Sequence, residues 1–263
     1  MKSVEELFKE LIDIIAKLRS EDGCPWDREQ THETLKIGII EEAYEVIETI
    51  DQKDDEKLEE ELGDLLMQVL LNAQIAKDDG KFGIAGVIQK INEKLIRRHP
   101  HVFGDLDVKD SDEIMKNWDR IKSEERANKD ESSLFDSIPT SLPALIQARK
   151  VQSRASRVGF DWNKADDVLK KVEEEIEELK EGIDKADQPN IEEEMGDILF
   201  SIVNLSRFLN VEPEDALRKT TAKFIRRFKQ MEAQIAQKGK KITDYDLAGL
   251  DKFWDSIKED EQK

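Results

Sequence analysis

The stretch "EEAYEVIETIDQKDDEKLEEELGDLL", residues 41–66, occurs twice in this chain in recognisable form. Its ends, "EEAYE" and "EEELGDLL", return as "EEIEE" at 174–178 and "EEEMGDIL" at 192–199, with the same internal gap. Self-similarity of this extent predicts two homologous halves. Three further pairs of blocks keep the same order: "CPWDRE" (24–29) loosely with "GFDWNK" (159–164), "KLIRRH" (94–99) with "KFIRRF" (223–228), and "WDRIK" (118–122) with "WDSIK" (254–258).

The composition favours long amphipathic helices over sheets. Of 263 residues, 39% are charged, Gly and Pro are scarce, and no segment shows strand alternation. We therefore expect an all-α fold with two homologous four- to five-helix domains in tandem, residues 1–128 and 143–263, joined by a Pro- and Ser-containing linker at 129–142. Apolar spacing and cap residues predict helices at 3–19, 34–50, 56–77, 84–98 and 111–128, and then from 142 and at 164–186, 191–209, 213–238 and 247–259.

The charge balance argues against two classes of partner. A net charge of −19 disfavours general nucleic-acid binding and anionic membrane surfaces, and no apolar run is long enough to span a bilayer. The single cysteine, Cys24, excludes an intrachain disulfide and a cysteine-rich zinc site. The N-terminus resembles an amphipathic helix more than a signal peptide, so the expected compartment is the cytoplasm.

Four carboxylates in each half have the spacing of a metal site. In so acidic a chain, a lone pair of acids three residues apart is usually a solvated face, but here the pairs recur with equal gaps. Residues three apart share a helix face, and two adjacent antiparallel helices would bring both pairs together. Such a cluster takes up protons or holds cations, and all-oxygen ligands suit Mg²⁺ or Mn²⁺. The candidate ligands are Glu42, Glu45, Glu61 and Asp64, and their counterparts Glu175, Glu178, Glu194 and Asp197.

Basic and aromatic residues recur downstream of the acids. Lys and Arg at helical spacing predict a face for phosphate oxygens, although salt bridges to the abundant acids would explain a single copy equally well. The repeated Trp side chains would be either core or a contact to the nucleotide base, and Trp26 and Trp162 would line a pocket wall. Gly63 and Gly196, both inside predicted helices, suggest either close approach of a backbone or ligand, or helix packing alone. The predicted substrate contacts are Lys94, Arg97, Arg98 and Trp118 in the first half and Lys223, Arg226, Arg227 and Trp254 in the second.

The motif "EEAYE…ELGD", repeated as "EEIEE…EMGD", resembles that of the MazG family of all-α nucleoside triphosphate pyrophosphohydrolases. The resemblance covers essentially the whole chain. It implies hydrolysis of NTPs and dNTPs to the monophosphate and pyrophosphate with Mg²⁺, mainly in the C-terminal half. It also implies that Glu175, Glu178, Glu194 and Asp197 hold metal and that Lys223, Arg227 and Trp254 contact the nucleotide, with Arg226 beside them and Lys171 as a weaker candidate. The first half departs from this pattern because Gly38 stands where the second half has Lys171.

Several alternatives remain open from sequence. Glu174 and Glu41, each next to a candidate metal ligand, are candidates for positioning the attacking water. A narrower relative, such as a dUTPase-like, dCTPase-like or phosphoribosyl-ATP pyrophosphohydrolase, is the nearest rival enzyme, and a non-catalytic acidic helical scaffold is the rival from another class. One half has only four or five helices with a thin core around a charged cleft. The resemblance implies that such domains pair into larger bundles, so we expect a homodimer that buries apolar helix faces.

Overall fold

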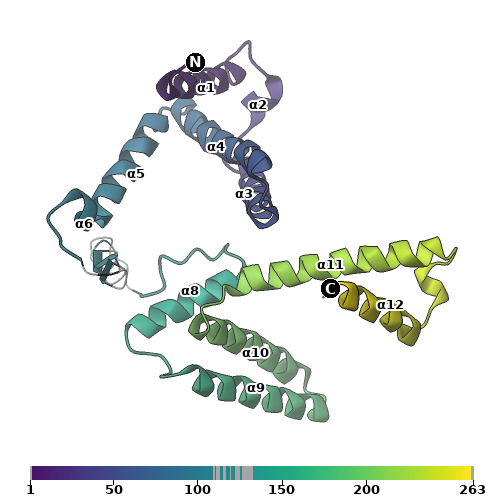
Figure 1. Cartoon of the computed structure of the whole chain (residues 1–263). Coiled ribbons are helices and arrows are strands. Elements are labelled where there is room, and N and C mark those ends of the chain that lie inside the picture. The colour runs from purple at the N-terminus through teal and green to yellow at the C-terminus, as the bar shows by residue number, and fades with distance from the viewer. Residues whose placement is uncertain are drawn as a thin grey trace. The chain divides into compact units, whose positions relative to one another are not determined.

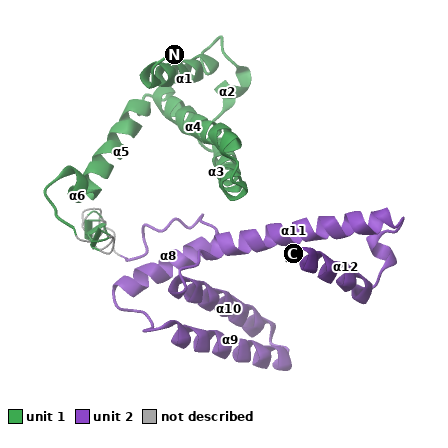
Figure 2. Cartoon of the chain, viewed as in Figure 1, with its two compact units in different colours: residues 1–125 green, residues 126–263 purple. Residues whose placement is uncertain are grey.

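The computed structural model describes residues 2–108, 110, 113–114, 117–118, 120–121, 125 and 133–261. Within these residues there are helices and no strands, so the all-α prediction is confirmed. The chain divides into two compact units, residues 1–125 and 126–263 (Figure 2). None of the helices in the described part is long and apolar enough to cross a membrane.

The first unit is built around a helical hairpin with one helix packed across it. The capping box of Ser3 and Glu6 starts the first helix as predicted. Two short helices lie in segments for which the sequence predicted no helix. Each begins with a proline, which suits the first helical turn because the backbone nitrogen at that position needs no hydrogen-bond partner. The predicted helix at 111–128 lies largely outside the described residues. The unit contains α1 (Val4–Leu18), α2 (Pro25–Glu29), α3 (Leu35–Gln52), α4 (Asp55–Asp78), α5 (Ile84–Arg98) and α6 (Pro100–Phe103).

The core of the first unit lies where α1 and the start of α3 meet the second half of α4. Ile15, Leu35 and Leu70 are buried there together with Leu71 and Ile75. The first half of α4 and the facing part of α3, which carry the acids, extend beyond this core (Figure 1). The apolar cluster therefore holds one end of the hairpin and leaves the acidic end to be shaped by its own polar contacts.

The second unit repeats the hairpin and adds a longer one. It contains α8 (Ala144–Arg157), α9 (Ala165–Lys185), α10 (Gln188–Phe208), α11 (Pro213–Gln237), the short 3-10 helix η1 (Ile242–Asp244) and α12 (Leu247–Asp260). α9 packs on α10, α8 packs on α10, and α11 packs on α12 around Met231, Ile235 and Ile257. In Figure 1 the α9–α10 and α11–α12 hairpins diverge from the region of α8. Residues 133–142, which we expected to belong to a linker, lie in this unit, and Ile138 is buried.

Candidate metal and phosphate sites

The turns that close the two acidic hairpins have the same geometry. Lys53 follows α3 with a left-handed φ of 57°, and Ala186 follows α9 with a φ of 51°. The next residue caps the following helix in both cases: the Asp54 side chain accepts from the Lys57 backbone N–H, and that of Asp187 accepts from the Asn190 N–H. This repeated turn folds the chain back on itself and explains why the gap between the two acid pairs is the same in both halves.

In the first half, the turn brings three predicted ligands together. Glu42, Glu45 and Glu61 each offer a carboxylate oxygen, and these oxygens all lie within 4.8 Å of one another. Burial raises the pKa of Glu61, and the charge of Glu45 adds to this effect. Burial also raises the pKa of Glu42, with the charges of Asp64 and Glu45 acting in the same direction. The fourth predicted ligand, Asp64, is therefore close enough to act on the cluster.

In the second half, the cluster consists of Glu175, Glu194 and Asp197, whose oxygens also lie within 4.8 Å of one another. The fourth predicted ligand, Glu178, shares a hydrogen bond with Glu175, and this contact raises the pKa of Glu178. Burial acts to raise the pKa of Glu175, but hydrogen bonds from Lys171 and Glu178 outweigh it, so that the pKa lies below its usual value. Both halves thus gather acidic oxygens into a ligand set that fits a hard divalent cation.

The two clusters differ in the group that compensates their charge. Lys171 Nζ lies 2.8 Å from Glu175 Oε1 and 2.7 Å from Glu174 Oε1, and both contacts raise the pKa of the lysine. The first half has Gly38 at the position of Lys171, and the buried Gln68 occupies the adjacent space. A Cβ atom at Gly38 would lie 2.8 Å from Gln68 Nε2. A neutral amide, which hydrogen-bonds to Glu42, thus stands in the first half where the second half has an ammonium group.

A second difference concerns the buried glutamate on the second helix of each hairpin. Asn190 Nδ2 donates to Glu194 Oε1 at 2.9 Å. The asparagine fits because Gly182 faces it: a Cβ on Gly182 would come within 2.5 Å of Asn190 Oδ1. In the first half, Lys57 Nζ lies 3.9 Å from Glu61 Oε1. Sequence reasoning identified neither Asn190 nor Gly182, although both lie within the repeated hairpin.

The duplicated arginines bind a glutamate in both halves. Arg97 and Arg98 both donate to Glu125, and Arg226 and Arg227 both donate to Glu261, with shortest N–O distances of 2.5 to 2.9 Å. The hydrogen bonds from Arg98 and Arg97 lower the pKa of Glu125 to about 2, and those from Arg227 and Arg226 lower the pKa of Glu261.

Sequence analysis missed these two glutamates. The signal was present, because each stands seven residues after the repeated tryptophan, at Trp118 and Trp254. The arginines of both basic faces are thus ion-paired with these glutamates, and their predicted contact with phosphate stays a prediction.

The lysines and tryptophans of the basic faces are placed differently. Lys94 and Lys223 form no ion pair with any residue that the structure describes. The Trp254 ring lies 5.0 Å from the ring of Phe224, and Arg227 Cζ lies 6.0 Å from the Trp254 centroid. The Trp118 ring lies 6.0 Å from that of His99. In the second half, the basic group belongs to the α11–α12 hairpin and the acids belong to the α9–α10 hairpin. Within the described residues, no ion pair joins the two groups.

Other predicted positions lie outside the acidic clusters. Glu41 and Glu174 are exposed, and Glu174 is bound by Lys171, so that their proposed role in water positioning stays a prediction. A Cβ on Gly63 or Gly196 would meet no other atom within 4 Å in the described structure, so the chain itself makes no close approach there. Trp26 is largely exposed, whereas Trp162 lines a cavity beside α10.

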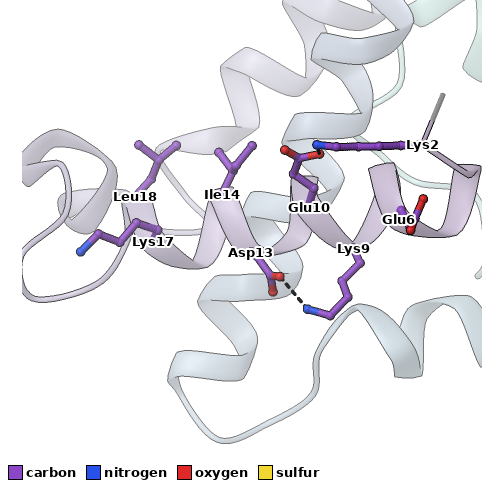
Figure 3. Close-up of a pocket in the computed structure, with 8 residues that line it drawn as sticks. All are labelled: Lys2, Glu6, Lys9, Glu10, Asp13, Ile14, Lys17 and Leu18. Carbon is purple, nitrogen blue, oxygen red and sulfur yellow. Dashed lines mark hydrogen bonds and ion pairs between the residues drawn. The ribbon is translucent and has the colours of Figure 1, made fainter.

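The hollow along α1 is a different kind of surface (Figure 3). It has a volume of about 590 Å³ and is lined only by Lys2 and residues of α1. Its charges include two ion pairs of 2.6 Å, Lys2 with Glu10 and Lys9 with Asp13. A single helix with paired charges offers no converging ligand set for a metal ion or a phosphate group.

Two carboxylate clusters on duplicated helical hairpins, each accompanied by an arginine pair on another helix, define an all-α protein with tandem candidate sites for a metal–phosphate ligand. Comparison with known proteins gives the family. The model of the MazG nucleotide pyrophosphohydrolase domain matches residues 30–103 and again 164–231. The chain belongs to this family of enzymes, and the resemblance noted from its motifs is confirmed.

Two relatives extend the similarity to the whole chain. The Thermotoga maritima protein named nucleoside triphosphate pyrophosphohydrolase/pyrophosphatase MazG is 52% identical over 258 residues, covering 98% of each chain. The Escherichia coli K12 protein named nucleoside triphosphate pyrophosphohydrolase is 45% identical, covering 95% of this chain and 97% of the relative. The tandem arrangement is therefore shared along nearly the full length of both.

Proposed function

We propose that this enzyme hydrolyses nucleoside triphosphates, both NTPs and dNTPs, to the monophosphate and pyrophosphate with Mg²⁺, mainly in its C-terminal half. The observation that carries the proposal is the cluster formed by Glu175, Glu194 and Asp197, within a family whose full-length relatives bear the name of this activity. Mn²⁺, which also prefers oxygen ligands, is the expected substitute.

The acids of the second half would hold the metal ion. Bound Mg²⁺ would neutralise the triphosphate and lower the pKa of a coordinated water. The raised pKa of Glu178 supports this role, because it reflects crowding of negative groups that a divalent cation relieves. Asn190 would keep Glu194 oriented, since it donates to one oxygen and leaves the other for the metal.

The basic residues would bind the phosphate chain. Lys223 is exposed and has no acidic partner among the described residues, so its ammonium group is available to a phosphate oxygen. Arg226 and Arg227 donate to the two oxygens of the Glu261 carboxylate, and two oxygens of a phosphate group can accept from guanidinium groups in the same way. Stabilising charge on the departing pyrophosphate is the role that this chemistry suits.

We assign the activity mainly to the C-terminal half because a lysine there compensates the negative charge of the carboxylate cluster. Lys171 neutralises part of the acidic cluster there, whereas Gly38 and Gln68 supply no positive charge in the first half. Lys57 in the first half stays 3.9 Å from Glu61, whereas Lys171 directly contacts the second-half acids, so a trianionic or tetra-anionic substrate would meet closer charge compensation in the second half. The first half retains its acids and would bind a metal ion with less support for the phosphates.

The test compares two double variants in a pyrophosphate-release assay with Mg²⁺. We expect Glu175→Gln/Glu178→Gln to lose activity by at least 100-fold, and the matched change Glu42→Gln/Glu45→Gln to retain most of it. Loss of activity only in Glu42→Gln/Glu45→Gln would assign the hydrolysis to the N-terminal half instead. Full activity in both would remove the metal-ligand roles and favour a scaffold.

We further propose a homodimer that covers apolar stripes on both acidic hairpins. Leu62, Leu66 and Val69 are 37–49% exposed on α4, and their counterparts Met195, Leu199 and Ile202 are 45–51% exposed on α10. Gly63 and Gly196 lie beside these stripes, and a Cβ on either would meet no described atom within 4 Å, so a second helix could approach closely there. A second copy is the matching occupant because it presents the same self-complementary stripe.

Sedimentation of a stripe variant tests this assembly. Leu199→Glu places a charge on the stripe, and we expect the wild type to sediment as a dimer and the variant as a monomer. A monomeric wild type would overturn the proposed assembly. A cytoplasmic setting, where a free thiol such as Cys24 stays reduced, completes the proposal.

A further inference from the structure

A cavity of about 440 Å³ lies in the second unit beside α8 and α10. Its volume is that of a site for a small organic molecule. Aromatic side chains form much of its wall, and the polar side chains among them belong to α8, α10 and the loop before α9. The residues that matter to its chemistry are Gln152, Phe160, Asp161, Trp162, Asn204 and Arg207.

Two buried amides at this cavity have unused hydrogen-bonding atoms. Gln152, only 7% exposed, donates from Nε2 to the Phe200 carbonyl at 2.7 Å, and its Oε1 is buried and accepts from no described group. Asn204, only 3% exposed, accepts at Oδ1 from Arg207, and its Nδ2 donates to no described residue. These contacts fix the orientation of both amides and leave one acceptor and one donor at the cavity wall.

The aromatic residues provide flat apolar surface next to these amides. Phe160 is 79% exposed and Trp162 is 42% exposed, although both line the cavity. Asp161 between them is held by an ion pair with Arg207, which fixes the loop to α10. Exposed rings beside unpaired amide atoms suit a ligand with a π face and a polar edge.

The cavity lies on the same face of α10 as the metal ligands. Glu194, Asp197, Ser201 and Asn204 recur at intervals of three or four residues, so they form one row along the helix. At 1.5 Å per residue, Asn204 lies about 10 Å from Asp197 along the axis. The cavity therefore lies along the same helix face as the metal ligands but apart from them, as the base of a nucleotide lies apart from its phosphates across the ribose.

The first half lacks this arrangement. Leu71 stands seven residues after Asp64, as Asn204 stands seven residues after Asp197. Leu71 is 3% exposed and packs in the apolar core with Ile15 and Leu35. The first half therefore has an apolar core side chain, Leu71, at the position of the polar cavity residue Asn204, so the two halves of one chain can be compared with and without this residue.

We propose that the cavity beside α8 and α10 is the subsite for the nucleobase of the substrate, with Phe160 and Trp162 stacking on the base and Gln152 and Asn204 hydrogen-bonding to its edge. This inference rests on the function proposed above and makes these residues the determinants of base preference. Trp254, on the other hairpin, is then left to contact the phosphate or sugar side.

The experiment separates base binding from phosphate binding. Affinities for nucleoside monophosphates and for inorganic pyrophosphate are measured by calorimetry with Mg²⁺, together with KM and kcat for the eight common NTPs and dNTPs. Trp162→Ala is the first variant because its side chain is partly exposed and its loss spares the core. Gln152→Leu is the second, and the exposed Gln89→Leu on α5 is its matched control.

We expect Trp162→Ala to weaken monophosphate binding and raise KM by about 5- to 100-fold, while pyrophosphate affinity stays unchanged. Gln152→Leu should in addition change the ranking of the bases, whereas Gln89→Leu should match the wild type. A parallel loss of monophosphate and pyrophosphate affinity, or no loss of either, would overturn the subsite. A wild-type protein that binds no monophosphate would overturn it as well.

The two proposals fail in different ways. Suppose that the wild type releases no pyrophosphate from any triphosphate but binds monophosphates, and that Trp162→Ala weakens this binding. The subsite then stands and the proposed hydrolysis fails. If pyrophosphate is released with the same KM and base ranking in wild type and variants, the hydrolysis stands and the subsite fails.

Discussion

At the scale of single residues, the two halves differ most at one contact. Lys171 binds Glu175 and Glu174 in the second half, while Gly38 leaves the matching space to Gln68 in the first. The acids themselves are the same in both halves. Lys57 of the first half lies 3.9 Å from Glu61, so what separates the sites is the position and closeness of the compensating lysine, which a motif defined by the acids alone does not reveal.

Replacement of Lys171 by Met tests this contact. The change removes a positive charge at 2.8 Å from a buried carboxylate, and we expect kcat/KM for pyrophosphate release to fall by about 10- to 100-fold. Lys170→Met is the matched control, because Lys170 is exposed and lies 3.8 Å from Asp167, away from the cluster. Equal losses in both variants would indicate a general effect of net charge.

The arginine–glutamate contacts of the first half predict a pH-dependent stability. The folded pKa of Glu125 is about 2 and lies below its unfolded value of about 4.3, so its contribution is present above pH 4.3 and is lost as the pH falls towards 2. We expect Glu125→Gln to lower the unfolding free energy by about 1–3 kcal/mol at pH 7 and to flatten this acid dependence.

Denaturant unfolding between pH 2 and pH 7 measures both effects. Glu93→Gln on α5 is the control, since Glu93 is exposed and hydrogen-bonds only to Gln89 among the described residues. An unchanged pH dependence in Glu125→Gln would show that the pair contributes nothing to stability.

At the scale of helices, the hairpin turn decides how the acids meet. Helical periodicity and the repeat predicted α3, α4, α9 and α10 to within a few residues, because apolar spacing and capping act locally. The pairing of Asn190 with Gly182, and of the arginines with Glu125 and Glu261, could not be predicted in the same way. These contacts depend on which faces of separate helices meet, and periodicity alone does not determine that.

Gly182→Ala probes the tight point of the second hairpin. The new Cβ would stand 2.5 Å from Asn190 Oδ1, so the asparagine side chain must turn away and release Glu194. Because alanine has a helix propensity about 1 kcal/mol better than glycine, the net change in stability should stay within about 1 kcal/mol. Mg²⁺ affinity, measured by calorimetry, should fall about 3- to 30-fold through the lost orienting contact.

Asn190→Ala should reproduce the loss of metal affinity without the steric change. If Gly182→Ala leaves Mg²⁺ affinity intact while Asn190→Ala lowers it, the asparagine has adapted and the contact at Gly182 is not critical.

At the scale of the whole molecule, replacing a glycine beside the exposed apolar stripes should change stability in opposite directions in a monomer and in a dimer. The Cβ of Gly196→Ala would meet no described atom within 4 Å, so in a monomer the change should stabilise by about 0.5–1 kcal/mol through helix propensity. In the proposed dimer the added methyl group would meet the partner helix. We then expect a lower melting temperature that rises with protein concentration, which scanning calorimetry at two concentrations resolves.

The neighbouring positions of Gly38 and Gln68 also constrain how the first half can change. The Cβ of a lysine at position 38 would lie 2.8 Å from Gln68 Nε2. The glutamine side chain would therefore have to turn and lose its hydrogen bond to Glu42. Positions 38 and 68 are therefore coupled, and restoring a lysine in the first half changes the hydrogen bonding of Glu42 as well as the charge beside it.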